Sequence, residues 1–177
     1  MFAISEIEDK IELAPSLGCF YSDIVKIINK RYIKKHTLDV GIGIKLFKDF
    51  EICEQRLVQD FVLATVKFKM LFFRFIRDEI LIGKVISQSQ VGVFVSLEFF
   101  DRILVEQTHL PEENEPTNIL NETNEKHFAW VWVYKGNRLV IKNGETVRMK
   151  VLHYDKKDGK LRCSFKETGL GPISWWE

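Results

Sequence analysis

Long hydrophobic runs and cysteines are scarce in this sequence, and each scarcity excludes a class of protein. The longest unbroken apolar stretches cover a few residues, so we expect no transmembrane helix and no membrane partner. Three cysteines, Cys19, Cys53 and Cys163, are odd in number and lie far apart, which argues against a disulfide framework and for a reducing compartment. The chain turns acidic directly after its first residues, without the basic and apolar regions of a secretory signal.

Catalytic and metal-binding motifs are also missing. Gly41-x-Gly43 lacks the third glycine and the following helix of a phosphate-binding loop. Ser96 and Ser164 have no nucleophile-elbow sequence around them. The histidines are scattered, and none pairs with a cysteine at the spacing of a zinc site. We therefore predict a protein that is not an enzyme, with no catalytic residues, no metal site and no cofactor.

Charge is balanced over the whole chain but not along it. The sequence has 26 basic and 25 acidic residues, with 46% hydrophobic residues, which is typical of a globular protein. Residues 98–125 hold eight acidic residues and one basic residue, whereas residues 126–177 hold eleven basic and five acidic residues. The sequence therefore contains an acidic insert followed by a basic C-terminal third, although the charge of the whole chain is nearly neutral.

The N-terminal half predicts an antiparallel sheet with one main helix. Alternating apolar residues predict strands over residues 2–13, 39–47 and 61–75. Isoleucines at three- and four-residue spacing predict an amphipathic helix over residues 22–35, with Ser22 as its N-cap. Both faces of the long strand turn apolar after Met70, which predicts a strand end buried on both sides.

Two glycines lie on one face of the strand over residues 39–47. Gly41 and Gly43 alternate with branched apolar residues, so the second face of this strand has no side chains there. One explanation is that another backbone or a helix approaches closely, and an equally good one is a bulged edge strand.

The C-terminal half predicts a small β-barrel or sandwich, because short apolar strands alternate with turns. The predicted strands cover residues 79–86, 91–97, 102–105, 130–134, 146–154 and 160–165. The acidic stretch over residues 107–127, with its Asn and Pro residues, predicts a mobile loop.

Basic and aromatic residues gather in the C-terminal third, as in modules that bind single-stranded nucleic acid. The alternative is that Tyr154 and Phe165 are core residues and that the lysines only make the surface soluble. The nucleic-acid-binding candidates are Lys84, Phe94, Lys150, His153, Lys156, Lys157, Lys160, Arg162 and Lys166.

Several blocks of this half resemble the S-one type of RNA-binding OB fold, a five-stranded barrel. The blocks occur in order as Gly83-Lys84-Val85, Gly92-Val93-Phe94-Val95-Ser96-Leu97, Gly144-Glu145-x-Val147-x-Met149-Lys150-Val151 and Asp155-x-x-x-Gly159-x-Leu161-x-Cys163-Ser164-x-Lys166. With the N-terminal half included, the chain resembles the larger stalk subunit of the RNA polymerases, a family with archaeal members and a paralog for each eukaryotic nuclear polymerase. The Trp130-Val131-Trp132 strand and the Trp175-Trp176 tail resemble the RNA polymerase III paralog in particular.

This resemblance implies a non-catalytic, nuclear subunit with two domains. Residues 1–77 would form an RNP-like tip domain that docks on the polymerase III core near the clamp, and residues 78–177 an OB-fold domain carrying the acidic insert. The implied partners are a smaller helical stalk subunit, the polymerase core, initiation factors and single-stranded RNA. Candidates for core or partner contacts are Gly41, Gly43, Phe72, Phe73, Trp175 and Trp176.

Two departures and two alternatives accompany the resemblance. Residues 51–61 lack the Pro- and Gly-rich turn common in the family, and the acidic insert would repel phosphate. A free-standing OB-fold RNA-binding protein would leave the N-terminal half unexplained. The equivalent subunit of RNA polymerase I or II is the other alternative. For the tail, packing of Trp175 and Trp176 on the barrel as a plug is favoured over a direct partner anchor.

Overall fold

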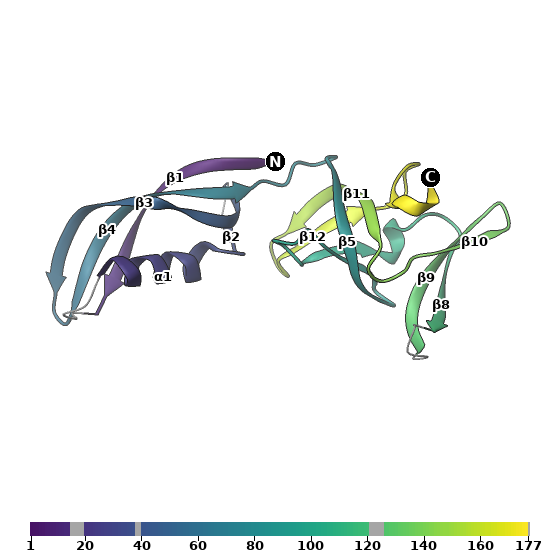
Figure 1. Ribbon diagram of the computed structural model, residues 1–177, viewed down its shortest axis with the longest axis horizontal. Coiled ribbons are helices and arrows are strands. Elements are labelled where there is room, and N and C mark those ends of the chain that lie inside the picture. The colour runs from purple at the N-terminus through teal and green to yellow at the C-terminus, as the bar shows by residue number, and fades with distance from the viewer. Residues whose placement is uncertain (15–19, 38–39, 121–125, 177) are drawn as a thin grey trace. The chain divides into compact units, whose positions relative to one another are not determined.

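The computed structural model describes residues 1–14, 20–37, 40–120 and 126–176. The chain divides into two compact units, Met1–Arg74 and Phe75–Glu177. Strands dominate both units, and the second contains a closed barrel, so the predicted mostly-β fold of the α+β class is confirmed (Figure 1).

The first unit is a four-stranded antiparallel sheet with a helix on one face. Its elements are β1 (Phe2–Leu13), α1 (Phe20–Tyr32), β2 (His36–Thr37), β3 (Gly41–Val58) and β4 (Phe61–Phe73). The strand order is β1-β4-β3-β2, with the long strand β4 in the middle, and α1 runs across one face of the sheet (Figure 1).

Alternation along β4 builds the core of this unit. Ile24 and Ile28 of α1 are fully buried against the sheet, as the helical spacing predicted. Their partners are side chains from one face of β1 and β4, namely Ile11, Leu13, Ala64, Val66, Phe68, Met70 and Phe72. Each fully buried side chain of this size stabilises the fold by about 1.5–3 kcal/mol relative to an exposed one.

The helix differs from its predicted bounds at both ends. It begins at Phe20, so Ser22 lies inside the helix and the predicted N-cap is wrong. It ends at Tyr32 rather than residue 35, because Lys34 adopts a left-handed backbone with φ of 58°. Cys19 and Asp39 lie outside the described residues.

Close backbone approach explains both glycines of β3. A Cβ on Gly43 would collide with the carbonyl oxygen of Tyr32, and one on Gly41 would collide with that of Phe73. The β3–β4 ladder also shifts register between Gly43 and Lys45, so the bulge is present as well. The close approach is therefore confirmed, with the approaching backbone in this same unit, whereas the bulged edge strand is right about the bulge and wrong about the edge, because β2 pairs with β3 at Gly41.

Strand β3 is longer than the sequence indicated. It continues to Val58 and meets β4 through a tight turn at Gln59 and Asp60, where Gln59 has a positive φ of 51°. Residues 51–58 are therefore strand, which explains why this region carries no Pro or Gly.

The second unit is built on a closed five-stranded barrel. Its strands are β5 (Ile80–Ser89), β6 (Gly92–Ser96), β7 (Ile103–Glu106), β11 (Thr146–Asp155) and β12 (Lys160–Ser164). They pair in the order β12-β7-β6-β5-β11, and a β11–β12 ladder closes the ring. The β7–β12 pair is parallel and the other barrel pairs are antiparallel, an arrangement that matches the OB fold.

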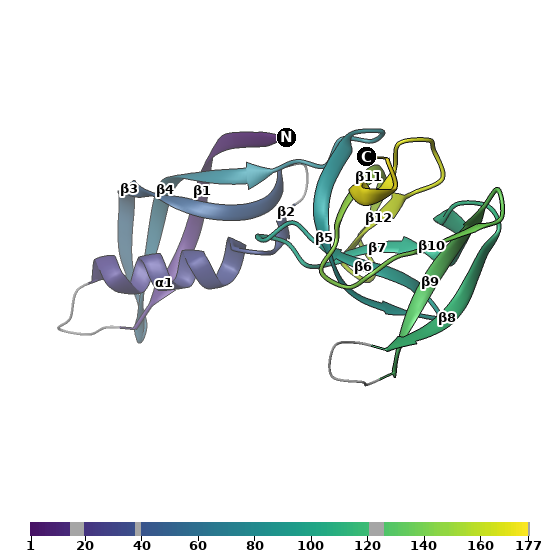
Figure 2. The same cartoon turned by 45° about the vertical axis from the view of Figure 1, so that its right-hand side comes forward.

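A small sheet of three antiparallel strands is inserted between β7 and β11 (Figure 2). After the 3₁₀ turn η1 (Gln107–His109), it consists of β8 (Asn114–Leu120), β9 (Lys126–Tyr134) and β10 (Asn137–Val140). The predicted loop over residues 107–127 is therefore wrong for β8, which pairs with β9 and tolerates Pro116 because it is an edge strand. The predicted strand over residues 130–134 exists but belongs to this sheet, not to the barrel.

Buried Trp130 attaches the inserted sheet to the barrel. Its indole Nε1 donates to the carbonyl oxygen of Ser89 at 2.9 Å, and its backbone N–H donates to Oε1 of Gln88 at 2.9 Å. The amide of Gln88 in turn donates to the carbonyl oxygen of Ile141 at 2.8 Å. The chain ends with β13 (Gly171–Pro172), which pairs with β11, and the 3₁₀ turn η2 (Ile173–Trp175).

Candidate nucleic-acid interface

The barrel face formed by β6, β7 and β12 carries one contact between a cation and an aromatic ring. Phe94 lies on β6, where it is half-buried, and the Nζ of Lys160 on β12 lies 5.7 Å from its ring centroid. The corresponding strands, with the β5–β6 and β11–β12 turns, form the oligonucleotide-binding face of OB folds. Two of the predicted candidates are thus brought together on the side that the fold class favours.

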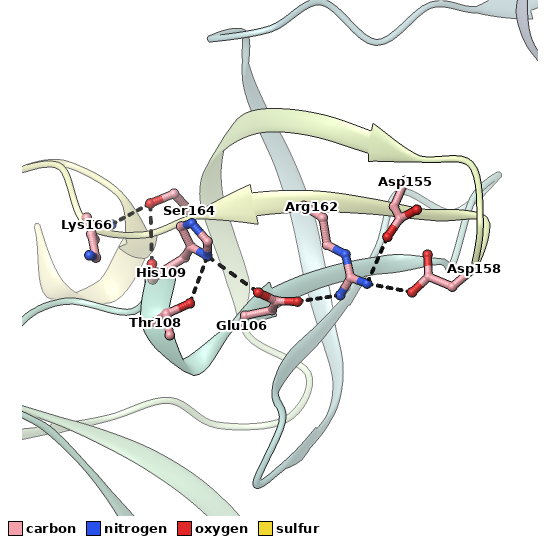
Figure 3. A network of polar contacts seen from close by, with 8 residues as sticks. All are labelled: Glu106, Thr108, His109, Asp155, Asp158, Arg162, Ser164 and Lys166. Carbon is pink, nitrogen blue, oxygen red and sulfur yellow. Dashed lines mark hydrogen bonds and ion pairs between the residues drawn. The ribbon is translucent and has the colours of Figure 1, made fainter.

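Arg162 of β12 has its charge satisfied by carboxylates from two elements (Figure 3). Its guanidinium lies 2.7 Å from Glu106 of β7, 2.6 Å from Asp158 and 3.5 Å from Asp155. The side chain is 14% exposed, so these contacts are shielded from solvent. Arg162 therefore shapes the β11–β12 turn, and little of its charge is left for phosphate.

The same turn lowers the pKa of a carboxyl group. The pKa of Asp155 lies below its ordinary value, first because its carboxylate accepts a hydrogen bond from the backbone N–H of Lys157 at 2.9 Å, then because of Arg162. Asp158 likewise accepts a bond from the backbone N–H of Lys160 at 3.0 Å. These bonds hold the turn in one shape.

Lys150 of β11 is also engaged within the unit. Its Nζ lies 2.6 Å from Glu167 and 3.2 Å from Asp78. The bond to Glu167, followed by that to Asp78, raises the pKa of Lys150 above its ordinary value. As a nucleic-acid candidate Lys150 is therefore already neutralised, as is Arg162.

The remaining candidates are spread over the barrel. Lys156 and Lys157 are exposed at the β11–β12 turn, and His153 is exposed on β11. Lys84 lies on β5 opposite Ser96, and Lys166 is exposed after β12. The structure thus places Lys156 and Lys157 in the turn that leads to Lys160 of β12, which is the lysine in contact with the Phe94 ring, and leaves Lys84 and Lys166 on other elements.

The two aromatic residues of the predicted patch pack inside the unit. Phe165 is 1% exposed, and Tyr154 is stacked on Phe75 with ring centroids 5.7 Å apart. Burial raises the pKa of the Tyr154 hydroxyl above its ordinary value. The alternative interpretation of these two residues as packing residues is therefore the one that the structure shows.

Carboxylates are the functional residues that sequence reasoning missed. Glu106 lies between Arg162 and His109 (Figure 3). Its Oε1 contacts the Arg162 guanidinium, and its Oε2 lies 3.9 Å from Nδ1 of His109. Glu106 and Arg162 are 56 residues apart in sequence, so their spacing gave no signal. Asp158 and Arg162 are four residues apart, and this spacing allows an ion pair only because the β11–β12 turn brings the two side chains together.

The tail tryptophans pack on the inserted sheet. The Trp175 ring lies 5.4 Å from that of Trp132 on β9, and Trp176 lies 6.2 Å from it. The indole of Trp176 donates to the carbonyl oxygen of Leu170 at 2.9 Å. Trp132 and Trp176 also line a pocket of about 110 Å³ together with Tyr134.

Of the N-terminal contact candidates, Phe72 is fully buried in the core of the first unit, and Phe73 is 5% exposed.

In the part of the chain that the structure describes, no three His, Cys, Asp or Glu side chains are grouped so that they could hold a metal ion. None of the described helices is long and apolar enough to cross a membrane.

Comparison with known proteins identifies the family. A family profile described as RNA polymerase III subunit Rpc25 matches residues 79–160. DNA-directed RNA polymerase III subunit RPC8 of Bos taurus is 31% identical over 209 residues, which covers 99% of this chain and 98% of that protein. The chain belongs to the RPC8 family of RNA polymerase III subunits.

Two further members extend the similarity across eukaryotes. The subunit rpc8 of Schizosaccharomyces pombe is 28% identical over 212 residues, covering 100% of both chains. That of Dictyostelium discoideum is 25% identical over 223 residues, covering 99% of this chain and 85% of the relative. The resemblance to the RNA polymerase III paralog is therefore confirmed, and RPC8 relatives match the N-terminal half as well as the barrel.

Proposed function

We propose that this protein is a non-catalytic stalk subunit of nuclear RNA polymerase III that supports transcription initiation. The observation that carries the proposal is the extent of the similarity, because an RPC8 relative aligns with 99% of this chain and 98% of its own length. A free-standing RNA-binding protein would need the barrel alone, and the matched N-terminal unit would then have no role.

The two units divide this work in the proposal. The first unit, Met1–Arg74, docks on the polymerase core near the clamp, and the second, Phe75–Glu177, is available to initiation factors and RNA. A smaller helical stalk subunit forms a heterodimer with this chain. The supporting feature in the first unit is its open sheet, which is covered on one face by α1 and ends in the long edge strand β1.

Affinity purification of the tagged protein from its own cells, at mild salt and with partners identified by mass, tests this function. We expect the large RNA polymerase III subunits and one small stalk subunit in fixed ratio. Recovery of polymerase I or II subunits instead would contradict the proposed assembly, and recovery of RNA and ribosomal proteins without polymerase would favour the free-standing alternative.

Weak contact with single-stranded RNA is a second candidate function, favoured by the Lys160–Phe94 contact beside exposed Lys156 and Lys157. Cations match the phosphates, and an aromatic ring can stack on a base without a fixed sequence. Since Arg162 and Lys150 are neutralised by carboxylates, and Lys160 lies 3.8 Å from Asp158, we expect the lysines at this turn to give low affinity with few phosphate contacts.

Replacing Lys156, Lys157 and Lys160 with Glu should lower RNA affinity and flatten its salt dependence. Each lost phosphate contact lowers the slope of log K against log salt by roughly 0.7 for single strands. The measurement is binding of a labelled single-stranded RNA between low and high salt. A matched control replaces exposed Lys30, Lys34 and Lys35 of the first unit with Glu, and an equal loss in both variants would contradict a site at this turn.

A further inference from the structure

One outward face of the barrel carries apolar side chains where a solvent-facing strand normally carries polar ones. Ile80, Ile82 and Ile86 of β5 are 58%, 60% and 48% exposed. Between them Gly83 and Val85 are buried. Single exposed apolar residues are ordinary, but isoleucines occupy three of four successive outward positions of β5, with Lys84 at the other, and clustered exposed apolar residues mark interaction sites. We call this patch the isoleucine stripe.

Cations lie within and beside the isoleucine stripe. Lys84 sits between Ile82 and Ile86 on the same face of β5. Across the β5–β11 ladder, Arg148 lies directly opposite Ile82, and directly opposed residues share a face.

These two cations differ from the third cation of the ladder. Lys150, opposite Ile80, is neutralised by Asp78 and Glu167. Among the residues that the structure describes, neither Lys84 nor Arg148 has a carboxylate within ion-pair distance. The face therefore combines unpartnered apolar area with uncompensated positive charge.

We propose that the isoleucine stripe, with Lys84 and Arg148, binds an acidic amphipathic segment of another protein chain. The apolar side of that segment packs on the isoleucines, and its carboxylates meet the two cations, which complement them in charge. The inference goes beyond the proposed function, because it assigns a surface and a partner chemistry that assembly into the polymerase does not specify.

Two other occupants fit the same face less well. Single-stranded RNA would find the cations, but branched aliphatic side chains offer no aromatic surface for base stacking. A second copy of this chain would place the same patch against itself in a two-fold interface, so that Lys84 and Arg148 would face like charges.

Site-specific photocrosslinking in the full-length protein tests the proposal. A benzoylphenylalanine at position 82 is activated in the purified native assembly, and the crosslinked peptide is sequenced by mass spectrometry. We expect one predominant peptide from another protein that is acidic and has apolar residues at helical or strand spacing. A crosslinker at exposed Asn137 of β10 is the control and should not yield that peptide.

Charge reversal tests the electrostatic half of the proposal. Lys84→Glu together with Arg148→Glu should lower the crosslink yield about tenfold, as expected for two charge pairs of ordinary strength. The matched control, Lys135→Glu with Lys142→Glu, changes two exposed cations elsewhere in the unit and should leave the yield unchanged. Ile80→Thr, which keeps a β-branched residue and leaves position 82 to the crosslinker, should lower the yield without lowering the melting temperature of the barrel.

The outcomes separate this inference from the proposed function. A crosslink at position 82 to RNA, to a second copy or to a basic or wholly polar peptide overturns the inference, as does a yield insensitive to charge reversal. Recovery of RNA polymerase III subunits is scored in the same preparations. The inference therefore fails alone if polymerase co-purifies normally while the expected crosslink is missing.

Discussion

The two units bury their cores by different means. In the first, the sheet is open, and its apolar face is covered by α1, whose Ile24 and Ile28 are fully buried. In the second, each of the five barrel strands pairs on both sides, and the core lies inside the ring. The stability of the first unit therefore depends on how closely α1 packs on the sheet. The stability of the barrel depends on unbroken strand pairing around the ring.

The units also carry different titrating groups whose pKa is raised, one partly buried and one fully buried. In the first unit the Tyr32 hydroxyl donates to Asp9 at 2.8 Å, and burial, followed by this bond, raises the pKa of Tyr32 to about 12. In the second unit Cys163 is fully buried in the barrel, and burial raises the pKa of its thiol to about 12. Each unit therefore contains its own reporter of alkaline pH.

The largest expected effect comes from adding a side chain at one closely packed glycine of each unit. Gly43→Val would force a Cβ against the carbonyl of Tyr32 and push α1 from the sheet. Gly83→Val would place a Cβ 2.6 Å from Val95 and 2.8 Å from the carbonyl of Ser96. Each should cost about 3 kcal/mol by overpacking, in its own unit only.

Hydrogen exchange of the full-length chain measures this unit by unit. Gly43→Val should lower protection within residues 1–74 and leave the barrel amides unchanged, and Gly83→Val should do the reverse. We also expect Gly43→Val to impair assembly into the polymerase more than RNA binding. Loss of protection in both units from either substitution would show that they are not energetically separate.

A smaller effect is expected at the polar network that fixes the β11–β12 turn. Arg162→Met keeps a long side chain but removes the guanidinium from Glu106 and Asp158, leaving Asp158 with only the 3.8 Å contact to Lys160. The loss should be about 1.5 kcal/mol, since the pairs are charge-assisted but the carboxylates are partly solvated. Urea unfolding followed by a barrel probe measures it. The first unit provides the control, since its own unfolding midpoint should not move.

The smallest expected effect is a difference between the two units in how their stability falls at alkaline pH. A group whose folded pKa is raised contributes stability that is present below its unfolded pKa and lost as pH rises through the folded value. For Tyr32 the loss runs from about pH 10 to 12, and for Cys163 from about pH 9 to 12. Tyr32→Phe should cost about 1 kcal/mol at neutral pH for the lost hydrogen bond and should remove part of the alkaline loss in the first unit.

Cys163→Ala completes this comparison in the barrel. It removes the thiol that titrates, so the barrel should lose less stability between pH 9 and 12 while the first unit behaves as before. The readout is hydrogen-exchange protection compared at neutral and alkaline pH, corrected for the intrinsic exchange rate. If neither substitution changes the loss of stability at alkaline pH, that loss comes from other titrating groups.

Much of this fold could be predicted from hydrophobic period alone. Alternation from Val62 to Met70 predicted the buried face of β4, and the spacing of Ile24 and Ile28 predicted the contact of α1 with the sheet. Strand β8 was missed because its acidic residues and Pro116 resemble a loop, and only pairing with β9 makes it a strand. Composition indicates the secondary structure that a segment favours by itself, but it does not show which strand will pair with that segment in the fold.

The candidate site was less predictable than the fold. The sequence named Lys160 and Phe94, which the structure brings together. It could not show that Arg162 is neutralised, because Glu106 comes from a strand 56 residues earlier. Cations can be counted in a sequence, but their availability depends on the carboxylates that folding places beside them.

The parallel ladder between β7 and β12 sets when the barrel can form during synthesis. Residues 103–105 pair with residues 161–163, and the whole inserted sheet lies between them in the chain. Closure must wait until residues 161–163 have left the ribosome, and such long-range contacts form slowly. The first unit is complete by Arg74, so the nascent chain should carry a folded sheet while β5, β6 and β7 still lack their closing strand.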